Sequence, residues 1–374
     1  MRGLLFASLL VACTGTLTSD GDPRDGGGDA GVDAMQLDAA LDAPGLDAPA
    51  LDAPGVDAGR DAGGPCATVA CGPMEACEAT TGTCVCMEGT IDTGAGCTIP
   101  PAGDPATRSE VEVCDMWAAG RVENASPAWI DDGTMCGPGT MPPDAIDDTV
   151  RRINLYRWLA GLPNLTNDPA RHDATMACAA LMSANGRLSH SPPMDWTCWT
   201  SEAAAAAATS NIAYGYGTAP AAIDGYMEDD GTESLGHRRW ILGRNLGSVG
   251  IGFSRVGSRP GQCLDIRGGG ASSERAWSAY PNPGPAPLFI ASQRWWSWQS
   301  YTVGMTAETD AVITRVSDGA DMPVITGQTG GFGPPPALRI EPNGWSAQAG
   351  ETYRVTILNL RDGDIAYDVQ VVDC

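Results

Sequence analysis

The sequence contains no lysine, since all 22 basic residues among its 374 are arginines. Schiff-base chemistry, a Ser-Lys catalytic dyad and the lysine of a phosphate-binding loop are therefore excluded. Histidine is also scarce, with three residues in the chain. After the N-terminus no apolar run is long enough to cross a bilayer as a helix.

Positive charge is in short supply as well. The 22 basic residues face 46 acidic ones, which gives a net charge of -24 and a pI near 4.2. This balance argues against nucleic acid or an anionic membrane surface as a partner. Much of the excess negative charge lies in residues 14–65, which contain 11 aspartates and two basic residues, Arg24 and Arg60.

The N-terminus predicts export. Met1-Arg2 is followed by the apolar run 3–12 and then by Cys13, which together are typical of a signal peptide. Leu10-Val-Ala-Cys13 resembles a lipobox, so we expect an acylated Cys13 that anchors the chain in a lipid bilayer of the cell envelope, at the outer membrane or cell surface. The alternative is an ordinary cleaved signal with an incidental cysteine. Without Cys13 an even number of twelve cysteines remains, which favours six disulfides in an exported chain.

We divide the chain by composition. Residues 1–13 are the signal peptide and lipobox, and residues 14–64 are a low-complexity tether with four imperfect pentads such as Leu41-Asp-Ala-Pro-Gly. Proline, glycine and repelling aspartates predict an extended, solvated chain there. A small cysteine-rich module (65–98), a mixed α and β domain (104–280) and a C-terminal domain of short strands (284–374) follow.

The cysteine-rich module has the spacing Cys-x4-Cys-x5-Cys-x6-Cys-x-Cys-x10-Cys and resembles an EGF-like module. That resemblance implies the pairs Cys66–Cys77, Cys71–Cys84 and Cys86–Cys97, whereas spacing alone permits fifteen connectivities. With few large apolar side chains, this piece needs its bridges to fold. For the other six cysteines we expect the pairs Cys114–Cys136, Cys178–Cys198 and Cys263–Cys374.

Apolar periodicity predicts helices and then strands. The helices cover 144–159, 168–185 and 220–227, with a short helical turn at 236–242. Strands follow at 249–253 and 262–267. Alternation at 311–316, 352–357 and 365–372 indicates a C-terminal β-sandwich. Residues 104–145 read as irregular.

Several ordered motifs lie between the first helix and the first strands. They are Asn154-Leu-Tyr-Arg157, Leu188-Ser-His190-Ser191, Ser210-Asn211-Ile-Ala, Tyr226-Met-Glu-Asp229, and Gly236-His237-Arg-Arg followed by Val249-Gly-Ile-Gly-Phe253. This order resembles the CAP superfamily (cysteine-rich secretory, antigen 5 and pathogenesis-related 1 proteins), in its bacterial secreted branch. The resemblance covers about residues 145–255. It implies an α+β fold with a three-layer α-β-α sandwich.

The same resemblance implies a ligand cleft. His190 and His237 match the two histidines of the family's cleft, and Asp229 matches one of its two acids. The other acid belongs to a Gly-Glu-Asn element, which is Ser210-Asn211 here. Two histidines and one carboxylate can hold Zn²⁺ with a water molecule, so a divalent cation is one candidate ligand beside a lipid or small molecule. The alternative is that both histidines are hydrogen-bonded structural groups.

Two other functions compete with this one. Ser191 beside His190 suggests a hydrolase, but no Gly-x-Ser-x-Gly elbow occurs and adjacent residues seldom form a nucleophile–base pair. No catalytic residue is assigned for this reason. Trp295, Trp296 and Trp298 suggest a glycan-binding or adhesion protein, because Trp296 and Trp298 share one face of a strand and can stack on a sugar. The alternative, which explains one face equally well, is that these rings pack into the core of the C-terminal β-domain.

Overall fold

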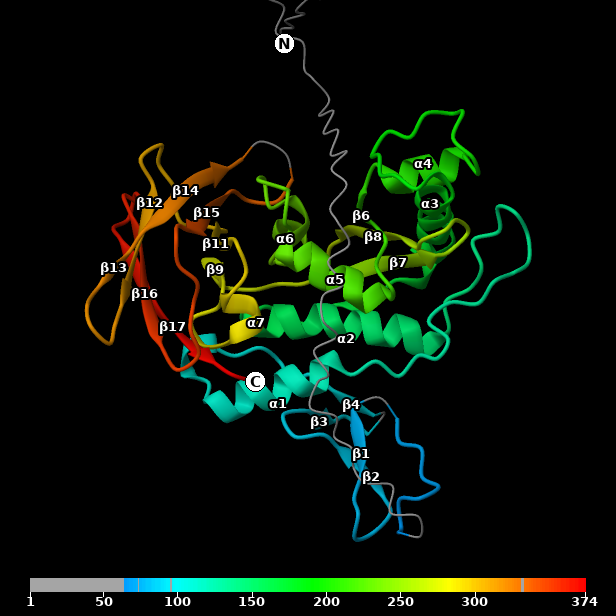
Figure 1. Ribbon diagram of the computed structural model, residues 1–374, viewed down its shortest axis with the longest axis horizontal. Helices are drawn as coiled ribbons and strands as arrows, with labels where there is room; N and C mark the ends of the chain where they lie inside the picture. Colours follow the sequence, from blue (N-terminus) through cyan, green and yellow to red (C-terminus); the bar gives the residue numbers. More distant parts are fainter. Residues whose placement is uncertain (1–63, 73, 95, 331–332) are drawn as a thin grey trace, which may run out of the picture. The chain divides into compact units, whose positions relative to one another are not determined.

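The computed structural model describes residues 64–72, 74–94, 96–330 and 333–374, which all lie in one compact unit, 48–374 (Figure 1). Cys13, the expected signal peptide and the tether up to residue 63 lie outside the described residues. Of the helices within the described ranges, none combines the length and the apolar character needed to span a bilayer.

The described chain begins with short strands, continues with helices and a first large sheet, and ends in strands. The helices are α1 (Glu110–Arg121), α2 (Pro143–Leu159), α3 (His172–Asn185), α4 (Ser201–Ala207), α5 (Ala219–Glu228), α6 (Gly236–Ile241) and α7 (Leu288–Ala291), with 3-10 turns at Pro105–Thr107 and Pro169–Arg171. The strands up to the first large sheet are β1 (Glu75–Cys77), β2 (Cys84–Cys86), β3 (Ile91–Asp92), β4 (Cys97–Thr98), β5 (Thr166–Asn167), β6 (Ser210–Tyr214), β7 (Ser248–Ser254) and β8 (Gly261–Gly268). The later strands are β9 (Trp277–Tyr280), β10 (Gly284–Pro287), β11 (Trp296–Ser300), β12 (Asp310–Arg315), β13 (Asp321–Met322), β14 (Val324–Thr329), β15 (Ala337–Pro342), β16 (Thr352–Leu358) and β17 (Ile365–Val372).

The first large sheet has the order β5-β7-β8-β6, and its central strand β7 explains the alternating glycines of the sequence. Gly250 and Gly252 point toward α3, which packs directly on β7 and β8. A Cβ added to Gly252 would lie 2.1 Å from the Thr175 carbonyl, so only glycine lets α3 approach this closely.

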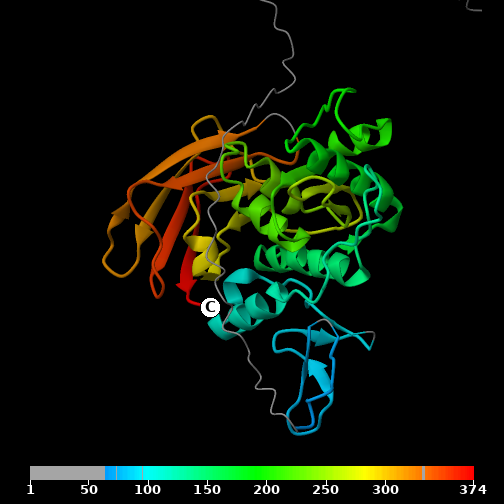
Figure 2. The same cartoon turned by 45° about the vertical axis from the view of Figure 1, so that its right-hand side comes forward.

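The opposite face of the same sheet is covered by α2 and α5 (Figures 1 and 2). Ile251 of β7 and Leu264 of β8 are fully buried there, in one core with residues of α2 and α5 such as Ile153 and Tyr226. Side chains alternate between the two faces of a strand, so the sheet presents small residues to α3 and branched apolar residues to α2 and α5. The expected mixed α and β domain is present, with helices on both faces of its sheet.

The C-terminal region is rich in strands, as the alternation predicts. One sheet has the order β10-β17-β16-β12-β13 and the other β14-β15-β11-β9, and both contribute to one buried core. β9 pairs with β11, so this region begins at Trp277, inside the range 104–280 that composition assigns to the preceding domain.

The cysteine-rich module consists of the hairpins β1–β2 and β3–β4. Its bridges are Cys66–Cys77, Cys71–Cys84 and Cys86–Cys97, the same pairing that the EGF-like resemblance implies. Met74 and Ile99 are only 3% and 2% exposed, because they pack into the core shared with α1 and α2.

The other three disulfides differ from the expected pairs. Instead of Cys114–Cys136, Cys178–Cys198 and Cys263–Cys374, the structure forms Cys114–Cys374, Cys136–Cys198 and Cys178–Cys263. The expected pairs were chosen mainly by nearness in the sequence, whereas the packing of helices and strands decides which cysteines meet. Cys178 of α3 faces Cys263 because α3 lies on β8, and α1 contacts β10, which pairs with β17 and so brings the C-terminus to Cys114.

The expectation of irregular chain over 104–145 is wrong for α1. Ser109 and Glu112 form a reciprocal capping box at its start, and Val113, Met116 and Trp117 bury its inner face. The Ser-x-x-Glu signal is visible in the sequence. Gly120 near the helix end weakens the helical pattern, but the structure needs this glycine because a Cβ there would lie 2.8 Å from Leu155.

Candidate functional site

Asp229 and His237 form the centre of the candidate site. Asp229 ends α5 in a left-handed conformation, with φ of 54°, and is 2% exposed. Its Oδ1 accepts a hydrogen bond of 2.7 Å from Nδ1 of His237, and its Oδ2 accepts one of 3.1 Å from the backbone N–H of Arg238. The carboxylate therefore fixes both the imidazole and the start of α6.

The His237 ring is also held from its flat side. Tyr226 stacks on it, with ring centroids 5.1 Å apart and an angle of 29° between the planes. The Tyr226 hydroxyl donates to the carbonyl of Asn211 at 3.0 Å, and the Asn211 amide donates to the carbonyl of His237 at 3.1 Å. In the sequence Tyr226 is distinguished only as the aromatic residue three positions before Asp229. The structure adds that its ring stacks on His237.

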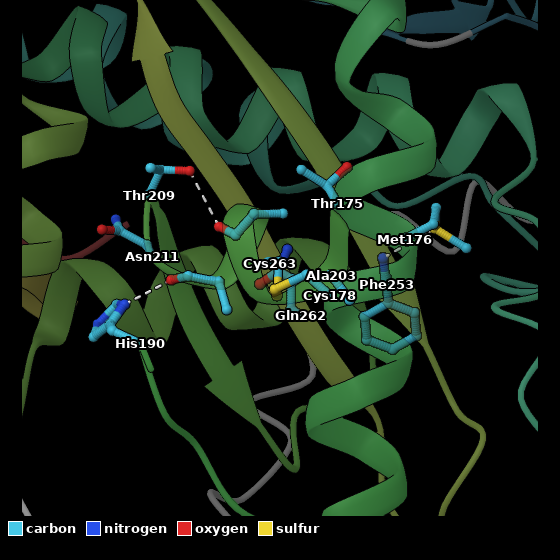
Figure 3. Close-up of a disulfide and its surroundings, with 12 residues drawn as sticks. Thr175, Met176, Cys178, His190, Ala203, Thr209, Asn211, Phe253, Gln262 and Cys263 are labelled. Atoms are coloured by element: carbon cyan, nitrogen blue, oxygen red, sulfur yellow. Dashed lines mark hydrogen bonds between the residues drawn. A yellow bond between two sulfur atoms is a disulfide. The ribbon is translucent and has the colours of Figure 1, made fainter. Parts of the chain in front are cut away.

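His190 lies at the other side of the site, on the loop after α3. Its Nδ1 donates to the carbonyl of Ala207 at 2.8 Å, at the C-terminal end of α4, where helix carbonyls lack partners within the helix (Figure 3). The surrounding protein lowers the pKa of His190 by desolvation; the hydrogen bond to Ala207 raises it, and the nearby His237 lowers it further. His190 is therefore neutral at pH 7, with its Nε2 lone pair available.

Both imidazoles thus use Nδ1 for orientation and leave Nε2 as the nitrogen that can receive a ligand. Ser210, where the family's Gly-Glu-Asn element has its acid, is 4% exposed, and its hydroxyl has no hydrogen-bond partner among the described residues. Asp229 is occupied by His237 and Arg238. Across the described ranges, no group of three or more His, Cys, Asp or Glu side chains is placed to hold a metal ion.

Arg157 of α2 holds the far end of α6, and Asn154 of the same helix holds the loop that follows α2. Arg157, fully buried, donates to the carbonyls of Pro163, Ile241, Gly243 and Leu246 at 2.7 to 2.9 Å. Burial lowers the pKa of Arg157 to about 10, so it stays charged at neutral pH. Asn154 closes the loop after α2 through the backbone N–H and carbonyl of Leu165. The Asn-x-x-Arg element therefore fixes backbone around the site and lies outside it.

Arg238, next to His237, joins this site to the C-terminal region. It is 1% exposed and donates to the carbonyls of Met227 and Glu228 at the end of α5. On the other side it donates to the carbonyl of Trp295 at 2.8 Å and lies 4.3 Å from the Tyr280 ring centroid. The position of α6 therefore depends on the strand region as well.

The geometry gives no support to the hydrolase hypothesis. Ser191 is exposed, and its hydroxyl makes no hydrogen bond to His190, whose Nδ1 is bound to Ala207. The remaining histidine, His172, is half-buried and bonds through Nδ1 to the carbonyl of Ile251 at 3.2 Å.

Of the two alternatives for Trp296 and Trp298, the structure shows core packing and contradicts sugar stacking. The two rings are 1% and 0% exposed, because that face of β11 packs into the core between the two C-terminal sheets. Trp295 is 2% exposed and lies between the Arg294 and Arg339 guanidinium groups. None of the three tryptophans offers a free ring face to a glycan.

Comparison with known proteins agrees with the motifs. Residues 150–264 match the model of the CAP family, the cysteine-rich secretory protein family. This range begins in α2, ends in β8 and contains every residue of the site described above. No curated protein matches the chain. Residues 150–264 of this chain are therefore a CAP domain.

Proposed function

We propose that this protein is exported and binds an extracellular ligand at the surface formed by His190 and His237. The observation that carries the proposal is the matched orientation of the two imidazoles. Each has Nδ1 bonded to an oxygen, at 2.8 Å in His190 and 2.7 Å in His237, and each keeps Nε2 for a ligand. The six disulfides and the CAP domain are features of an extracellular protein.

The chemistry of this surface favours a ligand that accepts an electron pair or donates a hydrogen bond. A neutral imidazole nitrogen can bind a divalent cation or accept a bond from a hydroxyl or amide group. A tightly held zinc ion does not fit, because such sites use three or four protein ligands and only two nitrogens are free here. The cation is therefore useful as a weak probe of the two imidazoles.

The first prediction concerns this probe and its pH dependence. We expect weak Zn²⁺ binding by calorimetry of the purified protein, abolished by His237→Ala and by His190→Ala. Ligation needs the neutral ring, and the pKa of His190 lies below its ordinary value of about 6.5 because the surrounding protein desolvates it. The contribution of His190 to the affinity should therefore be at its maximum at about pH 7.5 and fall only as the pH drops below about 6.5.

His172→Ala is the matched control, because this histidine is also part-buried and bonded to a carbonyl but lies outside the site. It should leave Zn²⁺ binding unchanged. Absence of binding to the wild-type protein refutes the two-imidazole site as a cation site. A large fall in the melting temperature of either site variant assigns the two histidines a structural role instead.

We also propose that the protein is anchored through an acylated Cys13. The six disulfides use all twelve cysteines from Cys66 to Cys374, and the sequence has thirteen, so Cys13 is the one outside these pairs. We predict that mass spectrometry of the mature N-terminus finds a diacylated Cys13, and that Cys13→Ser releases the protein into the soluble fraction. A mature, unmodified N-terminus beyond residue 13 contradicts the anchor.

A further inference from the structure

A cavity of about 570 Å³ lies where the C-terminal strands meet the segment before α1, outside the CAP match. This volume is within the roughly 300–1,000 Å³ of small-ligand pockets. Its chemistry is set by five side chains, namely Asp104, Arg275, Trp277, Tyr367 and Asp368.

The cavity forms where strand pairing stops. β10 pairs with β17 only from Gly284, opposite Val369, to Pro287, opposite Val372. The preceding β17 residues, Ala366 to Asp368, line the cavity and have β16 on one side but not β10 on the other. An uncovered strand edge offers backbone N–H and C=O groups to a ligand.

Tyr367 is the buried polar group at this place. It is 8% exposed, lines the cavity, and packs against Trp277 in a tilted arrangement with ring centroids 5.3 Å apart. Burial raises its pKa well above the ordinary value, so the hydroxyl keeps its proton. Among the described residues, this hydroxyl has no hydrogen-bond partner. The hydroxyl is not one of the side-chain atoms that the described residues seal from solvent without a partner, so it stays open to the cavity and can bond to a ligand there.

The charged groups of the cavity compensate one another. Arg275 pairs with Asp104 at 3.7 Å, and Asp368 forms a two-bond pair with Arg354 at 2.8 and 2.9 Å. No net charge is left for an anionic or cationic ligand to neutralise. The carboxylate and guanidinium groups still have free lone pairs and N–H groups for hydroxyl groups.

We propose that this cavity binds a neutral pyranose sugar. The half-buried Trp277 indole lines the cavity, and the part of it that Tyr367 and Trp298 leave uncovered meets the apolar C–H face of the sugar ring. The Tyr367 hydroxyl, the Asp368 carboxylate and the Arg275 guanidinium bind the sugar hydroxyls. A fatty acyl chain does not fit a cavity with three charged side chains, since their desolvation would be uncompensated.

The experiment is calorimetric titration of the purified protein with glucose, cellobiose, maltose, lactose and N,N′-diacetylchitobiose. Glucose 6-phosphate and glucosamine serve as charged probes of the same ring. We expect binding of at least one neutral saccharide. Tyr367→Phe, which removes only the unpartnered hydroxyl, should weaken it about three- to tenfold, the effect of one hydrogen bond. Asp368→Asn should weaken it to a similar extent.

Each variant has a matched control elsewhere in the chain. Tyr214→Phe removes another hydroxyl without a hydrogen bond among the described residues, and Asp318→Asn alters another aspartate in a two-bond pair with an arginine, Arg315. Neither control residue lines the cavity. Both controls should bind the saccharide like wild type, and all four variants should keep the wild-type melting temperature within a few degrees.

Three results overturn the proposal. The first is that no neutral saccharide of the panel binds. The second is that a saccharide binds and both Tyr367→Phe and Asp368→Asn leave its affinity unchanged, which places it elsewhere on the protein. The third is that glucose 6-phosphate or glucosamine binds more than tenfold tighter than the neutral sugars, which contradicts charge compensation in the cavity.

Discussion

Replacing Arg157 by methionine is expected to lower the free energy of unfolding of the CAP domain by about 3–5 kcal/mol. Methionine keeps much of the length of the side chain but supplies no donor. The carbonyls of Pro163, Ile241, Gly243 and Leu246 would all lose the guanidinium that binds them in the interior. Because α6 ends at Ile241 and Gly243 lies just after it, His237 at the start of the helix should lose its fixed position too.

Urea unfolding monitored by circular dichroism measures this change. Arg157→Lys should lower the free energy of unfolding by an intermediate amount. Its ammonium group keeps the charge but lacks the planar fork of donors with which the guanidinium reaches all four carbonyls. Arg294→Met is the control, since Arg294 is 56% exposed and its ion pairs with Glu341 and Asp230 lie at the surface. Its effect should stay within about 1 kcal/mol. An unchanged urea midpoint for Arg157→Met would show that the four hydrogen bonds make no net contribution to the free energy of unfolding.

Much of the CAP domain is predictable from local pattern. The run Val249-Gly-Ile-Gly-Phe253 predicts a buried strand, and the structure shows that its glycines admit α3 while its apolar residues face α2 and α5. The first of the expected helices, at 144–159, is found as α2, Pro143–Leu159. These elements have a period that burial on one face imposes, so the sequence carries their signal directly.

The strand β6 shows what a local pattern misses. Ser210-Asn211-Ile212 reads as a turn because serine and asparagine favour turns. In the structure β6 is the edge strand next to β8, with Asn211 opposite Leu264. Its polar residues are retained because Asn211 bonds to the backbone of His237 and to Tyr226, contacts that only the folded chain creates.

The sequence predicted which residues form the candidate site, but it did not predict what each of them does there. Motif order brings together His190, Asp229 and His237, but sequence does not show that Asp229 points away from a ligand and toward Nδ1 of His237. The sugar-stacking hypothesis for the tryptophans failed for a related reason. Alternation predicts that Trp296 and Trp298 share a face, yet it cannot say whether that face meets solvent or a second sheet. Here a second sheet covers it.

The second large effect should come from the Cys114–Cys374 disulfide, which closes a sequence separation of 260 residues. We expect Cys114→Ser combined with Cys374→Ser to lower the free energy of unfolding by about 5–6 kcal/mol, because the bridge restricts the unfolded chain more as the closed loop grows. It also ties α1 to the last strand, so amide exchange should rise in β10 and β17, the pair next to the C-terminus.

The pair Cys66→Ser and Cys77→Ser provides the comparison, since it removes a bridge with a separation of 11 residues. On the same relation this change costs only about 3 kcal/mol, and its effect should be confined to the cysteine-rich module. Urea unfolding of both double variants, with amide exchange measured by mass spectrometry, therefore ranks the two bridges. A smaller loss for the Cys114–Cys374 variant than for the Cys66–Cys77 variant contradicts the loop-length argument. It would mean that the packing of α1 against β10 already holds the C-terminal strand without the covalent bond.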